Sequence, residues 1–443
     1  MNIIYMHTHD SGRYLQPYGY SVPTPNLMKF AQDATVFRHC HTPGPTCSPS
    51  RAALLTGSYP HSNGMLGLAN RGFELYDMNQ HLVSFLNKNG YETVLSGIQH
   101  EAVAGNKIGY RKILNECAED LNMYLPDPEA FDLESAHLAA DYIKSRSNQD
   151  GHFFLSFGMI NTHRDYPSNR DKLNPDYIMP PAVVYDNKEN REDMSDYHYS
   201  VEVADRCAGI VIDAVRDSGL DDDTVIFFTT DHGLPFPRMK CNLYDTGTGV
   251  AFILKYPQNP TAGKALDSLV SNIDIFPTLC DLCHLPKPNW LQGVSLEPLL
   301  TGEKTEVREE LFGEITYHAS YEPMRSIRTS RYKLIRRYDY HNRIVPSNID
   351  NSNPKQFLMK SGWLDQVNDR ELLLDLYLDP LERINVVNDP RYREVYCDLS
   401  KKLADWMQET NDPLINIDHR LPKPEKARVN KLTCLHAEYP DYE

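Results

Sequence analysis

The feature that most restricts the fold is a repeated pattern of short apolar runs that end in polar, chemically capable residues. Four runs show it, at residues 3–6, 93–95, 153–157 and 225–228. Segments with helical periodicity lie between them, for example residues 26–34, 81–89 and 204–218. Strands that alternate with helices favour an α/β domain. We therefore expect an α/β fold with a large mixed, mainly parallel sheet flanked by helices.

The polar residues that follow these runs should lie close together. In parallel sheets, ligands bind beyond the carboxyl ends of the strands. The four polar segments are residues 7–10, 97–100, 161–164 and 231–233. The sequence therefore predicts one site at the carboxyl edge of the sheet.

The pattern changes after about residue 305. Strand candidates then follow closely at residues 311–315, 324–329 and 332–335, and a helix candidate at residues 394–410. A chain of 443 residues also exceeds what one hydrophobic core usually serves. We expect a catalytic domain over residues 1–305 and a smaller C-terminal domain over residues 306–443, with an antiparallel sheet and a helix.

Composition restricts the class of protein. The chain is 41% hydrophobic and 24% charged, as in globular enzymes, and its net charge of −16 argues against nucleic acid as a partner. We see no apolar run of membrane-spanning length and no export signal. Nine cysteines, an odd number, favour a reduced protein. We expect a cytoplasmic enzyme without a membrane partner. Cys280-x-x-Cys283-His284 resembles a haem attachment motif, but we expect core cysteines there.

Residues 47–57 predict an anion site that contains a potential nucleophile. We expect Cys47 just before a helix, with Ser48 as its cap, Pro49 at the first helical position and Gly57 at its end. Arg51 follows in the first turn. A helix N-terminus with a nearby cation binds anions.

The other strand ends offer metal ligands and hydrogen-bond donors. Asp10 and the pair Asp231-His232 supply oxygen and imidazole ligands for a divalent cation. Donors able to hold an anion and protonate a leaving oxygen come from four side chains: Arg51, His100, His163 and Lys240.

These motifs resemble the sulfatases of the alkaline-phosphatase superfamily over nearly the whole chain. The segments that carry the resemblance are Thr24-Pro25-Asn26-Leu27, Cys47-Ser48-Pro49-Ser50-Arg51 with Leu54-Leu55-Thr56-Gly57, Asp231-His232-Gly233, Asp274-Ile275-Phe276-Pro277-Thr278, and two C-terminal segments at residues 328–333 and 376–385. Gly64-Met65-x-Gly67 and Pro235-Phe236-Pro237 before Lys240 are similar to the N-sulfoglucosamine sulfohydrolase type.

The resemblance implies a sulfatase that acts on a sulfate ester or sulfamate, on a sugar. A formylglycine-generating enzyme would oxidise Cys47 to Cα-formylglycine, whose metal-polarised hydrate attacks sulfur. Asp10, Cys47, Asp231 and His232 would bind the metal, usually Ca²⁺. Arg51 would hold the formylglycine, His100 and Lys240 would contact the sulfate, and His163 would protonate the leaving group.

Two positions depart from the family pattern. His9-Asp10 stands where consecutive carboxylates are usual, so His9 is a candidate ligand and Mn²⁺ an alternative metal. Ile98 stands where the family has a lysine that grips the sulfate, which removes a charge-assisted contact of about 1.5–3 kcal/mol. Arg13 or Arg164 could supply the missing charge.

Two other functions remain open from the sequence. A phosphonate monoester or phosphodiester hydrolase on the same scaffold would use the same nucleophile and an Asp-His metal pair. A catalytically silent binding protein would have lost the chemistry along with the lysine. The identity of the substrate depends on the segments around the pocket, such as residues 164–190 and 338–365.

Overall fold

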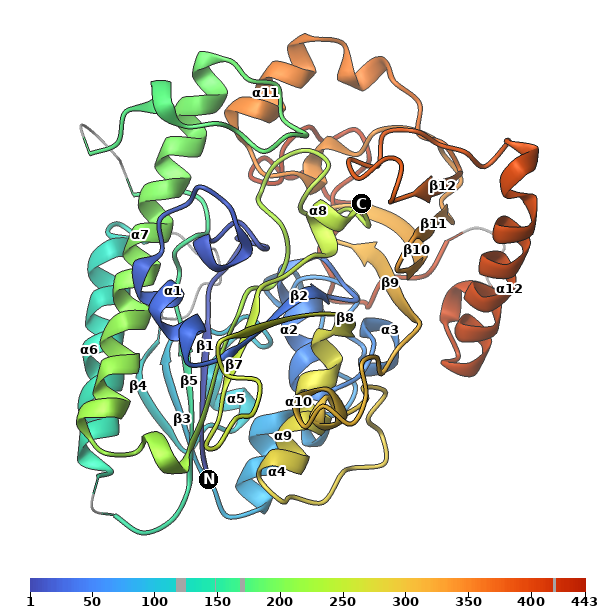
Figure 1. The fold of residues 1–443 in the computed structure, drawn as a ribbon. Helices are drawn as coiled ribbons and strands as arrows, with labels where there is room; N and C mark the ends of the chain where they lie inside the picture. Colours follow the sequence, from blue (N-terminus) through green and yellow to red (C-terminus); the bar gives the residue numbers. More distant parts are fainter. Residues whose placement is uncertain (117–124, 148, 168–171, 417–419) are drawn as a thin grey trace.

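The computed structural model describes residues 1–116, 125–147, 149–167, 172–416 and 420–443 (Figure 1). Its centre is an eight-stranded sheet of order β4-β3-β5-β1-β6-β7-β2-β8. In that order the strands are Lys112–Glu116, Glu92–Gly97, Phe153–Gly158, Asn2–His7, Thr224–Thr229, Phe252–Lys255, Thr35–His41 and Lys264–Ser271. Only β7 runs antiparallel to its neighbours, β6 and β2. The predicted mixed, mainly parallel sheet is confirmed.

Helices cover both faces of this sheet, as Figure 1 shows. One layer contains α1 (Pro25–Gln32), α6 (Pro128–Ser145) and α7 (Lys188–Asp217). The other contains α2 (Cys47–Thr56), α4 (Leu82–Lys88) and α9 (Ile275–Leu282). Short helices complete the fold: α3 (Pro60–Asn63), α5 (Gly105–Ile108), α8 (Asp245–Thr248) and α10 (Glu297–Leu300).

The central strand β1 explains the two layers. Successive side chains of a strand point to opposite faces. Ile4 and Met6 accordingly pack into the core beneath α1, α6 and α7, whereas Ile3 and Tyr5 pack into the core beneath α2, α4 and α9. All six residues of β1 are buried, which is why the strand is apolar without alternation.

Helix α7 is longer than the sequence predicted. We expected a helix over residues 204–218, but α7 begins at Lys188. Its first half is mostly polar, although Met194, Tyr197 and Val201 pack into the core, and specific bonds also hold it in place. The Asn187 side chain accepts the Asn190 backbone N–H at 2.8 Å, and the Arg164 guanidinium binds buried Asp193 at 2.6 Å.

The C-terminal part contains the predicted antiparallel sheet. Its order is β12-β11-β10-β9, with strands Glu371–Asp375, Tyr332–Arg337, Tyr321–Thr329 and Glu310–Tyr317. Helix α12 (Arg393–Glu409) packs on β10 and β11, and α11 (Asn353–Lys360) lies nearer α7 (Figure 1). Strand β12 was not predicted. The boundary at residues 305 and 306 stays a prediction.

The cysteines of the 280–283 segment belong to the core, as expected. Cys280 lies in helix α9 and is buried in the core, and Cys283, just after the end of that helix at Leu282, packs against the same core. No helix within the described ranges is long and apolar enough to cross a membrane.

Candidate active site

Cys47 is the first residue of α2, not the residue before it. Thr46 is the N-cap, with extended backbone angles, and its carbonyl oxygen accepts the Ser50 N–H at 2.9 Å. The predicted cap Ser48 is therefore inside the helix, where its hydroxyl accepts the Ala69 N–H at 3.0 Å. Pro49 is the third residue of α2, whereas we expected the first, and it is tolerated there because N–H groups of the first turn have no intrahelical partner. Gly57 ends α2 in the left-handed region, with φ of 65°, as expected.

The ends of β1 and β6 bring four candidate ligands together next to Cys47. The Cys47 Sγ lies 3.3 Å from His232 Nε2, which is 3.2 Å from Asp10 Oδ1. Asp231 Oδ1 accepts the Asp10 backbone N–H at 2.9 Å, and His9 Nδ1 lies 3.4 Å from Asp231 Oδ2. One oxygen, nitrogen or sulfur atom from each of His9, Asp10, Cys47 and Asp231 lies within 4.8 Å of the others.

Gly233 allows this cluster to form. A Cβ atom at this position would lie 1.8 Å from the carbonyl oxygen of Thr246. The backbone must pass that close because the Gly233 N–H donates to the Gly247 carbonyl at 2.9 Å. The glycine of the Asp-His-Gly segment is therefore a steric requirement of the turn that presents His232.

Arg51 lies beneath the cluster as a buried counter-charge. Its Nη2 donates to Asp231 Oδ2 at 3.1 Å and to the Thr8 carbonyl at 2.8 Å, and its Nη1 contacts His7 Nδ1. Burial alone would raise the pKa of Asp231, but His232 and Arg51 outweigh it and hold that pKa well below its ordinary value. Asp231 is therefore a carboxylate at neutral pH.

The residues present fit a divalent metal. Both ring nitrogens of His9 and Oδ1 of Asp10 are buried without a hydrogen-bond partner among the described residues. Buried polar atoms without a partner are costly unless a ligand satisfies them. Carboxylates and imidazoles that converge on one point suit a divalent cation.

The thiol of Cys47 is poorly suited to act as a thiolate. Burial raises its pKa well above the ordinary value, and Lys240 opposes that shift without overcoming it. A thiol nucleophile needs a lowered pKa. The geometry thus places Cys47 at the centre of the site but does not activate its sulfur.

Lys240 has a partner that the sequence did not suggest. Its Nζ lies 3.2 Å from Asp10 Oδ2 and 2.7 Å from Asp350 Oδ2. Burial by itself lowers the pKa of Lys240, but Asp10 and Asp350 outweigh burial and raise it. The lysine is therefore an ammonium group held between the candidate metal ligands and the segment that precedes α11.

These groups open into a pocket of about 610 Å³. Its wall from the large sheet includes Cys47, His100, His163, Arg164 and Lys240. Its other wall comes from residues beyond 305, namely His318, Asp350, Asn351, Arg428, residues 437–440 and Tyr442. A volume in the range of ~300–1,000 Å³ suits a small ligand.

The two predicted histidines differ in their surroundings. Burial, with the charge of Arg51, lowers the pKa of His100 to about 3, so this imidazole is neutral. Both of its nitrogens lack a hydrogen-bond partner in the described part of the chain. His163 donates from Nδ1 to the Arg164 carbonyl oxygen, which leaves Nε2 to exchange a proton with a ligand.

The structure separates the two arginines considered as replacements for the missing lysine. Ile98 itself is buried and packs against Ile160 in a small apolar cluster. Arg164 lines the pocket but is paired with Asp193 at 2.6 Å. Arg13 lies in a different hollow, with Tyr20 and Asp245. Of the two, only Arg164 reaches the site. Residues 168–171 of the predicted loop lie outside the described residues.

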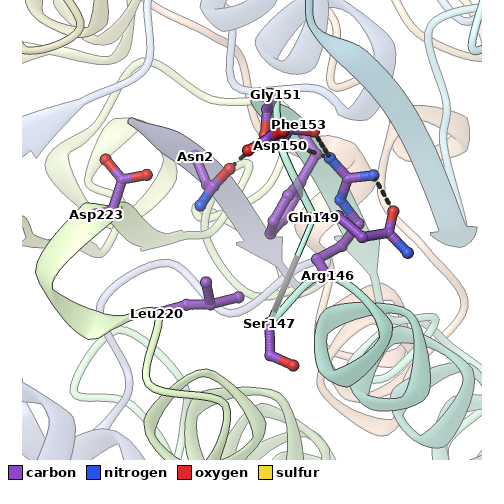
Figure 2. A pocket seen from close by; sticks show the side chains of 9 residues that line it. All are labelled: Asn2, Arg146, Ser147, Gln149, Asp150, Gly151, Phe153, Leu220 and Asp223. Atoms are coloured by element: carbon purple, nitrogen blue, oxygen red, sulfur yellow. Dashed lines mark hydrogen bonds between the residues drawn. The ribbon is translucent and has the colours of Figure 1, made fainter.

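A third hollow lies at the opposite edge of the sheet. Figure 2 shows it at the starts of β1 and β5, where Asn2, Arg146 and Asp223 are among the residues that line it. Its lining includes no cysteine or histidine. The cysteine and the histidines of the candidate site lie elsewhere, at the carboxyl edge of the sheet.

Sequence reasoning missed the residues of the far wall. His318, Asp350 and Arg428 belong to segments that follow the large sheet by many residues. His318 lies between β9 and β10, is 4% exposed, and its Nδ1 has no hydrogen-bond partner among the described residues. The one signal was general: the segment 338–365 was expected to surround the pocket.

Sequence comparison supports the motifs. The sulfatase family model matches residues 2–285, and the model for the N-sulphoglucosamine sulphohydrolase C-terminal region matches residues 233–354. Human N-sulphoglucosamine sulphohydrolase is 28% identical, over 89% of this chain and 87% of its own length. An ulvan-active sulfatase from Formosa agariphila is 27% identical, over 97% and 77% respectively.

Structural comparison agrees on the fold. The structure of a 2-O GAG sulfatase superposes with a TM-score of 0.74 at 21% identity, over 96% of this chain and 95% of that one. A phosphonate monoester hydrolase from Silicibacter pomeroyi superposes with a TM-score of 0.71 at 18% identity, over 94% and 97%. The family assignment rests on the sequence models, and the chain belongs to the sulfatase family, whose members are sulfuric ester hydrolases.

Proposed function

We propose that this enzyme hydrolyses the sulfate ester or sulfamate of a sulfated saccharide, with formylglycine made from Cys47 as its nucleophile. The observation that carries the proposal is the convergence of Cys47, which lines the pocket, with the buried side chains of Asp10, Asp231 and His232. A phosphorus ester would require the same cluster, so the sulfur chemistry rests on the family assignment.

A divalent cation would be held by Asp10, Asp231, His232 and the oxygen that replaces the Cys47 sulfur. His9 is a fifth candidate, since both its nitrogens are buried and without a hydrogen-bond partner among the described residues. When bound, such a cation lowers the pKa of a hydroxyl and neutralises charge on the sulfate oxygens. We propose Ca²⁺, with Mn²⁺ as the alternative because of the imidazoles.

The chain's own residues would perform the remaining work. Arg51 neutralises Asp231 and so holds the floor of the site in place. Lys240 and neutral His100 would donate hydrogen bonds to sulfate oxygens as negative charge develops there. His163 would protonate the leaving oxygen or nitrogen from Nε2, since Nδ1 is bound to a carbonyl oxygen.

A sulfated amino sugar is the substrate class that the comparisons favour. Both the C-terminal family model and the human relative carry N-sulphoglucosamine in their names. The C-terminal model covers Lys240, His318 and Asp350, which line the pocket. Part of the pocket wall therefore lies in the matched segment.

The test combines maturation with turnover. The chain is expressed with a formylglycine-generating enzyme, the mass of the Cys47 peptide is measured, and bound metal is determined. Aryl sulfate, aryl phosphonate, bis-aryl phosphate and N-sulfoglucosamine are then compared as substrates. We expect a formylglycine mass, bound metal and the highest kcat/KM on a sulfate or sulfamate.

Two results would contradict this proposal. Turnover of the phosphorus esters alone would make the enzyme a phosphonate or phosphodiester hydrolase. An unmodified Cys47 together with no bound metal would favour the catalytically silent binding protein. The Cys47→Ala variant serves as the blank for every substrate.

A further inference from the structure

Arg71 lies on the wall of the pocket that Cys47 and Lys240 also line. It ends the short 3-10 turn Ala69–Arg71. Its Nη1 donates to Asn430 Oδ1 at 3.0 Å and, more weakly, to two carbonyl oxygens, and its Nη2 donates to the Ala437 carbonyl at 3.3 Å. These bonds hold the guanidinium in place.

The same bonds leave donors of Arg71 free. A guanidinium has five N–H donors, and the contacts above use Nη1 and one hydrogen of Nη2. Nε and the second Nη2 hydrogen have no partner among the described residues. Elsewhere in this protein that pair of nitrogens binds one carboxylate, as in Arg328 with Asp245 and Arg331 with Asp375. Arg71 therefore keeps the atoms with which an arginine binds an anion bidentately.

A second uncompensated cation lies beside it. The Arg428 backbone N–H donates to the Arg71 carbonyl at 2.8 Å, and the exposed Arg428 guanidinium donates to the Asn70 carbonyl at 2.6 Å. Within the described ranges no carboxylate lies within 4.0 Å of either guanidinium, although Glu438 lines the same pocket. Burial and the charge of Arg428 lower the pKa of Arg71, and the nearby Tyr442 and Glu438 offset this shift without overcoming it.

The other cations of the pocket differ in this respect. Lys240 is paired with Asp10 and Asp350, and Arg164 with Asp193. Two adjacent positive charges without a counter-ion repel each other unless an anion joins them. Among the described residues, Arg71 and Arg428 are therefore the cations of this pocket that have no paired carboxylate. They are separate from the Cys47 cluster.

We propose that Arg71 and Arg428 form a second anion subsite, which binds a carboxylate or second sulfate of the saccharide while the scissile group lies at Cys47. The proposal rests on the proposed function and narrows it to substrates that carry two anionic groups. The pocket of about 610 Å³ is large enough for a ligand of drug-like size, which a disaccharide matches.

The experiment compares three ligands on the matured enzyme. The first is N-sulfoglucosamine, with one anionic group. The second is glucosamine with an N-sulfate and a 6-O-sulfate, and the third is a disaccharide of N-sulfoglucosamine and a uronate. The variants are Arg428→Gln, which removes an exposed side chain, Arg71→Gln and Arg71→Lys, with thermal unfolding as a check on folding. Arg146→Gln, at the opposite edge of the sheet (Figure 2), is the control.

We expect the wild type to favour one two-anion ligand, and which one identifies a sulfate or a carboxylate as the second group. Arg428→Gln and Arg71→Gln should lower kcat/KM on that ligand about 10- to 100-fold, mainly through KM. They should leave the one-anion ligand within about twofold. The kcat/KM of Arg71→Lys should be intermediate, because a lysine keeps the positive charge but lacks the paired N–H donors of a guanidinium. Equal losses on all ligands, or no preference in the wild type, would overturn the subsite.

A binding measurement separates this inference from the proposed function. Should no ligand be hydrolysed, titration calorimetry on Cys47→Ala with the same three ligands replaces turnover. Two-anion ligands that bind more tightly, with a gain lost in Cys47→Ala/Arg428→Gln, would support the subsite although the sulfatase proposal failed. Equal affinities would overturn it.

Discussion

At the scale of single residues, the site consists of buried charges that depend on one another. Lys240 is 1% exposed and lies between Asp10 and Asp350, and Arg51 is 2% exposed and lies against Asp231. Taking such charges out of water is costly, and close partners offset that cost. A substitution of one partner therefore affects folding and chemistry together, and the two effects must be separated.

The Lys240→Met substitution should separate them when it is combined with Asp350→Asn. The single variant leaves two buried carboxylates without their cation, so we expect the free energy of unfolding to fall by about 3–5 kcal/mol. The double variant should recover about 1–2 kcal/mol of this. Neither should recover turnover, because the sulfate contact is lost. Urea unfolding and kcat/KM measure the two effects.

Lys333→Met provides the matched control. Lys333 is equally buried and binds Asp245 and Glu382, both at 2.6 Å, but it lies outside the active-site pocket. It should lower stability to a similar degree and leave kcat/KM of the folded enzyme unchanged. A double variant of Lys240 and Asp350 with wild-type turnover would contradict a role of Lys240 in sulfate contact.

The Ile98→Lys substitution tests the missing lysine. Ile98 is 2% exposed and packs against Ile160 and not into the pocket, so a lysine there would be buried without a partner. We expect a loss of about 2 kcal/mol or more in unfolding free energy and no gain in kcat/KM on a sulfate ester. Ile98→Leu is the control for packing. A gain in kcat/KM for Ile98→Lys would show that position 98 can still reach the sulfate.

At the scale of elements, the start of helix α4 is held by a hydrogen bond that depends on the protonation state of His81. His81 precedes α4, and its Nδ1 accepts the Val83 N–H at 3.2 Å, which requires an unprotonated nitrogen. Burial lowers the pKa of His81 to about 3. Since the ordinary value is about 6.5, the unfolded chain takes up this proton before the folded one does.

Stability should therefore fall as the pH drops below about 6.5. His81 contributes up to about 1.4 kcal/mol per pH unit to that fall until the folded pKa is reached. His81→Asn keeps a capping acceptor without the titration, so its unfolding free energy should change less steeply between pH 6 and pH 4, by about 1 kcal/mol per unit. Urea unfolding at several pH values measures the slope. Parallel slopes for both proteins would contradict the assignment.

At the scale of the whole molecule, the site depends on groups from both ends of the chain. Asp10 follows β1 near the N-terminus, whereas Asp350, Arg428 and Tyr442 come from beyond the large sheet. A core that contains Ala52 and Met65 together with Tyr317 and Leu403 joins the two parts. A ligand in the pocket would therefore link the stability of both sheets.

Metal removal should show this link. A metal that binds only the folded protein adds about 2.7 kcal/mol at a concentration 100 times its Kd. We expect chelation to lower the Tm and Ca²⁺ or Mn²⁺ to restore it, monitored by circular dichroism of the whole chain. Asp10→Asn should abolish most of the metal response. A Tm that does not respond to chelation in the metal-loaded wild type would contradict the metal site.

Much of the architecture could be read from local patterns. The buried strands β1, β3, β5 and β6 were predicted because each is a short apolar run, and their carboxyl ends meet because parallel strands share an edge. The first half of α7 was missed because its polar residues are buried through specific hydrogen bonds and ion pairs. Strand β12 was missed because local sequence carries little information about which distant strand it pairs with.

The sequence by itself determined the family and the α/β class, and it predicted the chemistry that we propose for Cys47, Asp10, Asp231 and His232, because motifs and strand ends are local features. Only the tertiary structure decided which distant groups complete the pocket. Asp350 reaches Lys240 across 110 positions of the chain, and Arg71 meets Arg428 across 357. Contacts at such separations depend on how the two sheets pack, and no local pattern specifies that packing.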